Sequence, residues 1–153
     1  MATAPTSILV RHTGQWLETV STELLTPGQL VTIGPQAIGP YNGNVETTVI
    51  ASSNPAYTAP AWVISEQYLF DFMGSVNLVE LPVYPIGSTL PIMVCLSGDV
   101  AWCRTVVADM TIGDGVVIDQ ENPGCLKKAY DPLVPMGYAI ATPYYGYVKV
   151  IFA

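Results

Sequence analysis

The sequence predicts an all-β protein, and three observations support this prediction. Glycine and proline, thirteen of each in 153 residues, punctuate the chain about every dozen residues, which leaves no room for long helices. The apolar residues between them alternate with polar ones or form short runs, as in strands. Charged residues make up only 11% of the chain, against about 25% in an average soluble domain. We expect one compact domain of short antiparallel strands arranged as a β-tulip, a barrel or a sandwich.

The predicted strands are separated by turn residues along the whole chain. They are residues 29–33, 45–51, 61–65, 76–83, 90–96, 100–107, 115–119, 134–141 and 145–152. The last of them alternates most clearly, with Tyr147, Lys149 and Ile151 on one face and Val148, Val150 and Phe152 on the other. Residues 16–24 are expected to be extended, because threonine and serine are poor in helix interiors. Residues 66–73 fit one or two helical turns.

The amino-terminal residues 1–14 are predicted to form an extended arm, followed by a single β-rich domain over residues 15–153. A subdivision near residue 83 is an alternative. The arm contains small polar residues and Pro5, and then an apolar stretch that is suited to pairing with an exposed sheet edge. The residues expected to bind a partner are Ile8, Val10, Arg11 and Trp16. The competing interpretation is an ordinary first strand, and deletion of the arm separates the two, because only loss of a strand lowers the melting temperature.

Two segments 85 residues apart resemble each other. Residues 25–33 and 110–118 share Thr, Gly, Val and Ile at matching positions. The common feature is a glycine-centred turn that leads into a buried β-branched strand. Two small similar β units are therefore an alternative organisation of the domain.

Composition excludes several partners. The net charge of −7 and the pI near 4.3 leave no basic surface for a nucleic acid backbone or an anionic membrane. Prolines and glycines interrupt both long charge-free runs, and no secretory signal is recognisable at the amino terminus, so we expect synthesis in a cytoplasm. Cys95, Cys103 and Cys125 form no even disulfide framework. A bond between the first two requires a three-residue loop centred on Asp99.

The sequence contains no recognisable catalytic constellation, so we expect no enzyme, no cofactor and no metal. His12 is the one histidine, and no nucleophile elbow or nucleotide-binding glycine motif occurs. Carboxylates gather in the last third, but turn formation explains them better than Ca²⁺ binding. A pair of glycosidase carboxylates is the remaining enzymatic alternative. The aromatic residues are more typical of core and interface packing than of sugar stacking; they are Trp16, Trp62, Trp102, Tyr144, Tyr145 and Tyr147.

From residue 84 onward, the chain resembles the capsid decoration, or cement, proteins of tailed bacteriophages. The matching features are Tyr84-Pro-Ile-Gly-Ser-Thr-Leu-Pro-Ile92 before a hairpin, Thr111-Ile-Gly-Asp-Gly-Val-Val-Ile118, Pro123-Gly-Cys-Leu126, Met136-Gly-Tyr-Ala-Ile-Ala141 and the closing strand Tyr147-Val-Lys-Val-Ile151. The resemblance covers about 70 residues, and residues 122–135 depart from it as an insertion-like stretch.

The resemblance implies a structural virion protein on the outer surface of an icosahedral capsid. Its partners would be the major capsid protein, whose subunits it bridges, and other copies of itself, expected as a trimer. The low charge of the chain agrees with a surface that is partly covered by protein. Two other classes stay open: a tail- or fibre-associated β-domain and a carbohydrate-binding module.

Overall fold

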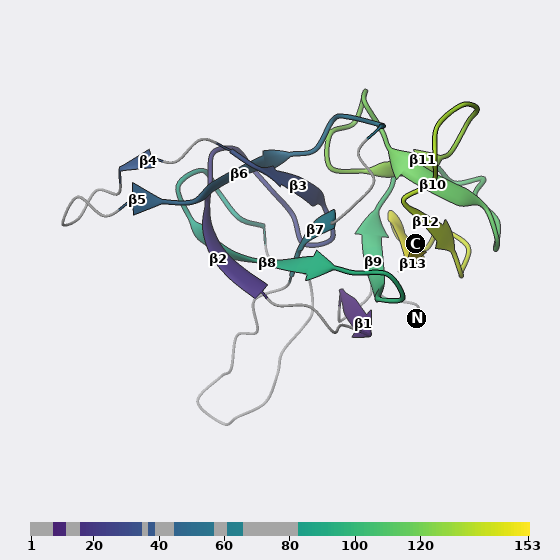
Figure 1. Ribbon diagram of the computed structural model, residues 1–153. Coiled ribbons are helices and arrows are strands. Elements are labelled where there is room, and N and C mark those ends of the chain that lie inside the picture. Colours follow the sequence, from purple (N-terminus) through teal and green to yellow (C-terminus); the bar gives the residue numbers. More distant parts are fainter. Residues whose placement is uncertain (1–7, 12–15, 35–36, 39–44, 57–60, 66–82) are drawn as a thin grey trace.

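The computed structural model describes residues 8–11, 16–34, 37–38, 45–56, 61–65 and 83–153. Within these ranges the chain forms thirteen strands and no helix, which confirms the predicted all-β class. A closed barrel lies beside a six-stranded sheet, and a small two-stranded ribbon extends from the barrel (Figure 1). None of the described residues forms a helix that is long and apolar enough to cross a membrane.

The barrel consists of five short strands. Around the barrel the order is β2 (Trp16–Ser21), β6 (Thr48–Ala51), β3 (Leu30–Ile33), β7 (Ala61–Ile64) and β8 (Thr89–Cys95). All neighbours are antiparallel except β2 and β6, which are parallel. Closure leaves no unpaired edge along these strands. The separate ribbon pairs β4 (Ala37–Ile38) with β5 (Val45–Glu46).

The second unit is an antiparallel sheet. Its order is β1 (Leu9–Arg11), β9 (Val100–Arg104), β13 (Tyr147–Phe152), β12 (Gly137–Ala139), β10 (Gly115–Ile118) and β11 (Leu126–Lys128). In β13, Val148, Val150 and Phe152 are buried while Lys149 and Ile151 are half-exposed, as the alternation predicts. Tyr147, predicted on the same face as Lys149, is buried as well, and its hydroxyl donates to the Pro27 carbonyl at 3.3 Å. Val148, Val150 and Phe152 belong to a buried cluster that also contains barrel residues.

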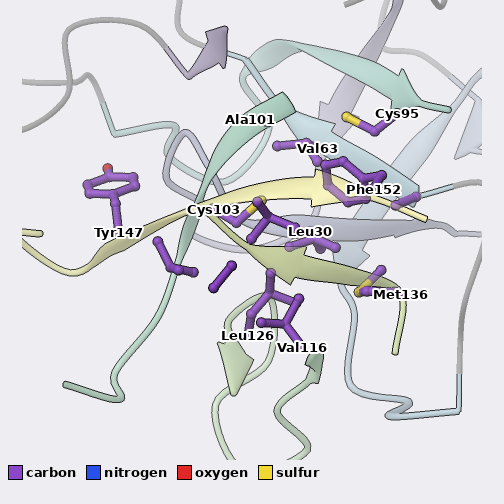
Figure 2. Close-up of a cluster of buried hydrophobic side chains, with 14 of the residues drawn as sticks. Leu30, Val63, Cys95, Ala101, Cys103, Val116, Leu126, Met136, Tyr147 and Phe152 are labelled. Atoms are coloured by element: carbon purple, nitrogen blue, oxygen red, sulfur yellow. The ribbon is translucent and has the colours of Figure 1, made fainter. Parts of the chain in front are cut away.

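Strand alternation also joins the barrel to the sheet. Leu30 and Val63 point out of the barrel into a cluster with sheet residues such as Val150, and their neighbours Val31 and Ile64 belong to a second cluster with other barrel residues. Figure 2 shows the first cluster, with Leu30 and Val63 close to β13. Burying each such side chain contributes about 1.5–3 kcal/mol. The first cluster therefore forms a core that the two units share, and the second belongs to the barrel side alone.

A single type of turn precedes five strands of the described chain. Each turn has a glycine with φ between 82° and 95° at its third position, and the next residue donates its N–H to the first carbonyl at 3.0–3.2 Å. This is the geometry of a type II turn, which requires a left-handed residue at that position. The glycines are Gly28, Gly87, Gly98, Gly113 and Gly124. The similarity between residues 25–33 and 110–118 is this turn and its strand, and residues 84–92 repeat it.

Several predicted boundaries differ from the observed ones. The segment 45–51 is divided into β5 and β6, the strand at 100–107 ends at Arg104, and only residues 137–139 of the segment 134–141 are extended. Strand β11 lies in the stretch interpreted as an insertion. Residues 76–82 and the predicted helical turns at 66–73 lie outside the described ranges.

The turn at residues 96–99 does not close a hairpin, contrary to the sequence interpretation. Strand β8 pairs within the barrel, whereas β9 pairs with β13 and β1 in the sheet. The type II turn redirects the chain from one unit to the other. Cys95 and Cys103 are consequently not cross-strand partners, and both are free and buried, as is Cys125. After Cys95 the chain passes from the barrel to the sheet.

Candidate functional site

The amino-terminal residues expected to bind a partner lie in two units of the fold. Ile8 is 0% exposed and belongs to the shared core, and its carbonyl accepts the Trp102 N–H at 2.7 Å. Val10 and Arg11 lie in β1, the edge strand beside β9, whereas Trp16 begins β2 in the barrel. The side chains of Val10, Arg11 and Trp16 are not among those described. Their contact with a partner stays a prediction, and Ile8 is explained by packing within the chain.

The clustered carboxylates form turns. An Asp99 carboxylate oxygen accepts the Leu96 N–H at 2.8 Å, and an Asp114 oxygen accepts the Thr111 N–H at 2.8 Å. The bond from Thr111 and the nearby Lys128 ammonium lower the pKa of Asp114. Within the described ranges, no group of three or more histidine, cysteine or acidic residues is placed to hold a metal ion.

The three cysteines are buried, and Cys95 and Cys103 belong to the cluster shared by barrel and sheet. Burial, together with the charge of Asp99, raises the pKa of Cys95 to about 12. Burial raises the pKa of Cys103 well above its usual value, and it also raises the pKa of Cys125. Because the thiolate is the nucleophile, these side chains are poorly suited to covalent chemistry at neutral pH.

A cluster of rings on the outer side of the six-stranded sheet forms the most distinctive surface of the described chain. Trp102 and Lys149 are cross-strand partners on β9 and β13, and the Lys149 Nζ lies 5.9 Å from the centre of the Trp102 ring. The Tyr144 ring lies 6.3 Å from that of Trp102. The Tyr145 ring meets Tyr144 edge-on, with their centres 4.7 Å apart. We call Trp102, Tyr144, Tyr145 and Lys149 the aromatic face.

A tight turn displays Tyr145 to solvent. Tyr144 and Tyr147 exchange two backbone hydrogen bonds, of 2.7 and 3.0 Å, around Tyr145 with φ 49° and Gly146 with φ 78°. Two left-handed residues in succession define a type I′ turn, in which asparagine, aspartate or glycine is preferred at the first position. A tyrosine there costs about 1–2 kcal/mol. The turn keeps the Tyr145 side chain 57% exposed.

The basic side chains of the described chain have two kinds of partner, carboxylates and aromatic rings. Lys127 and Lys128 pair with Asp119 at 3.8 Å and Asp114 at 3.5 Å. The Arg104 guanidinium instead lies 4.9 Å from the centre of the Tyr147 ring. Within the described part of the chain, neither Arg104 nor Lys149 has a carboxylate within 4.0 Å. Lys149 is therefore the charged member of the aromatic face, and Arg104 lies two residues from Trp102 along β9.

Apolar side chains continue this face onto the next strand of the sheet. Tyr138 on β12 is the cross-strand partner of Ile151, and the Ile140 N–H donates to the Lys149 carbonyl at 2.9 Å. The side chains of Tyr138 and Ile140 are 45% and 38% exposed. Tryptophan, tyrosine and arginine beside aliphatic groups are typical of protein interfaces.

Sequence reasoning noted these aromatic residues but not their assembly. Tyr144 and Tyr145 are adjacent in the sequence, whereas Trp102 reaches them only through the pairing of β9 with β13. The alternation in β13 places Lys149 on the face opposite to the buried valines. Alternation alone does not show that Trp102 lies beside Lys149, because the register between distant strands is not encoded locally.

The described chain thus has an all-β fold in which a closed five-stranded barrel and a six-stranded sheet share a core. This fold is similar to that in the crystal structure of the head fibre gp8.5 N base of bacteriophage phi29, with a TM-score of 0.57 and 10% sequence identity. The similarity covers 92% of this chain and 95% of that one. No protein-family model and no curated protein matches the sequence.

Proposed function

We propose that this chain is a structural, non-enzymatic virion protein that attaches to the outer surface of a phage capsid. The observation that carries the proposal is the fold similarity to a head fibre base, which extends over 92% of this chain. A match of this extent includes both the barrel and the sheet. The resemblance of residues 84–153 to decoration proteins supports the same assignment from the sequence.

The finer part of the proposal is that the chain stabilises the capsid by bridging neighbouring major capsid protein subunits. A protein that binds only the assembled lattice adds its binding free energy to the stability of the particle. A trimer would present three such contacts at once and gain affinity through multivalency. The low charge content of 11% supports a surface that is partly covered in the assembly.

Co-sedimentation with empty capsid shells of the encoding phage tests this function. We expect the purified protein to sediment with shells, saturate at a fixed ratio to the major capsid protein and raise the melting temperature of the shells. Unassembled capsid subunits are the control, since a bridging protein binds them weakly. A chain that stays in the supernatant at micromolar concentration contradicts the proposal.

A fibre- or tail-associated role is the second candidate, because the matched structure is described as the base of a head fibre. Electron microscopy of shells and tails mixed separately with the protein distinguishes the two roles. Density on the shell lattice supports the first candidate, and density on tails alone supports the second.

A further inference from the structure

We propose that the aromatic face is the surface through which this chain binds the shell, and that its partner there is a protein surface carrying exposed carboxylates. This inference rests on the proposed function and adds the location of the contact and the chemistry of the partner. The charge of Lys149, the rigid support of the rings and the backbone strain at Tyr145 each support it.

The first argument is charge complementarity. Among the basic side chains that the structure describes, Lys127 and Lys128 already have carboxylate partners, whereas Lys149 and Arg104 lie against rings. A carboxylate brought to this face would meet Lys149, which has no carboxylate within 4.0 Å in the described part of the chain, and Arg104 lies nearby against the Tyr147 ring. Docking of the same face from a second copy would bring two Lys149 side chains and no carboxylate of the face into one interface, and like charges in one interface are unfavourable. The charge pattern therefore favours a different, acidic protein over a symmetric dimer.

The second argument is the display of rings on a rigid support. Trp102 and Lys149 lie on paired strands, and Tyr144 is fixed by its two hydrogen bonds to Tyr147. Rings that are held in place lose little conformational entropy on binding. Tryptophan and tyrosine are also enriched among the residues that contribute most to protein binding. The neighbouring Ile140 and Tyr138 add apolar area of a kind that suits a protein partner better than a sugar.

The third argument is the strained turn at Tyr145. An Asn-Gly pair satisfies a type I′ turn with less strain than the Tyr145-Gly146 pair present here. The exposed ring is packed edge-on against Tyr144 alone among the rings of the described chain. Strained residues of this kind gather at functional positions. A binding role for Tyr145 accounts for an exposed tyrosine where the backbone prefers asparagine.

Tyr145→Asn separates a binding role from a structural one. If the ring serves binding, the variant melts at the same temperature as the wild-type protein or higher, while its affinity for shells falls about tenfold or more. If the ring serves only the fold, the melting temperature falls and the affinity of the folded protein is unchanged. The matched control is Tyr130→Ala, because Tyr130 is 50% exposed and also lies near a lysine, Lys127, at 5.1 Å.

Substitutions at Lys149 test the chemistry of the partner. Lys149→Glu is expected to weaken shell binding about tenfold or more, and Lys149→Arg to retain it, because an acidic partner repels the first and accepts the second. Raising the salt concentration from about 50 to 500 mM should weaken binding of the wild-type protein and affect Lys149→Glu less. Lys128→Glu is the control charge reversal and should change affinity by less than about twofold.

The outcomes distinguish this inference from the proposed function. If the wild-type protein does not bind shells, both are overturned. If the wild-type protein binds and the Tyr145 and Lys149 variants bind equally well, the function stands and the aromatic face is not the contact. Selective loss of binding in these variants, with unchanged controls, supports the inference.

Discussion

Individual glycines in this protein serve two different purposes. At Gly113, with φ 95°, a methyl group would meet no atom within 4 Å, so only the left-handed backbone requires glycine. At Gly28, with φ 88°, a Cβ would lie 2.7 Å from the Tyr147 ring and 3.0 Å from the Trp102 carbonyl oxygen. The Gly28 position therefore combines a backbone requirement with close packing of the barrel against the sheet.

We expect the two glycines to respond differently to substitution by alanine. Gly113→Ala should lower the free energy of unfolding by about 1–2 kcal/mol, the cost of a left-handed residue with a side chain. Gly28→Ala should cost about 1–3 kcal/mol more, because overpacking is added to the same strain. Urea denaturation of both variants measures the difference. Equal losses would show that the contact with Tyr147 relaxes freely.

The cysteines permit a second prediction for single residues. Because burial and Asp99 raise the pKa of Cys95 to about 12, this thiol remains protonated at pH 8 and its thiolate is scarce. The raised pKa values of Cys103 and Cys125 have the same consequence. A thiol-specific chromogenic reagent at pH 8 should react slowly with the native protein and rapidly with all three thiols after denaturation. A fast native reaction would contradict the packing described for these side chains.

The burial of the residue before strand β1 indicates whether this strand belongs to the domain. The strand contains three residues, Leu9–Arg11, and the sequence alone allowed an arm or an ordinary first strand. The complete burial of Ile8 beside it favours a strand that belongs to the domain. Deletion of residues 1–14 is then expected to lower the melting temperature.

Ile8→Ala tests the structural role of this segment without deleting any residue. We expect the free energy of unfolding to fall by about 2–5 kcal/mol, as for other isoleucines removed from a core. Ile86→Ala is the matched control, since Ile86 is 73% exposed and should change stability by less than about 0.5 kcal/mol. Thermal unfolding followed by circular dichroism compares the two. A small effect of Ile8→Ala would favour the interpretation as an arm.

Local signals predicted most of the strands, and long-range pairing limited the rest. Neighbouring residues encode the glycine turns before β3, β8 and β10 and the alternation in β13. These elements could therefore be predicted from the sequence. The assignment of β8 to the barrel and β9 to the sheet depends on partners far along the chain, such as Leu90 opposite Thr19. The aromatic face escaped prediction for the same reason, because the contact between Trp102 and Tyr144 is created by pairing.

The whole molecule is organised around a core that both units share. Leu30, Val63 and Cys95 from the barrel lie in the same cluster as Ala101 and Val150 from the sheet. The barrel also takes β8 from the second half of the chain. The side chains of this shared cluster are buried only while the two units are in contact, so we expect one cooperative unfolding transition.

Single-tryptophan variants follow the two units separately. Trp62 lies in β7 of the barrel and Trp102 in β9 of the sheet, so each can report on its own unit after the other tryptophans are replaced by phenylalanine. Within each variant, urea unfolding followed by fluorescence should have the same midpoint as unfolding followed by circular dichroism, because breaking the shared core exposes both units together. Adding Val63→Ala should lower both midpoints in parallel, since this side chain lies between barrel and sheet and its truncation leaves a cavity in their common core. If Trp102 instead reports a transition that Val63→Ala leaves in place, the sheet folds independently of the barrel.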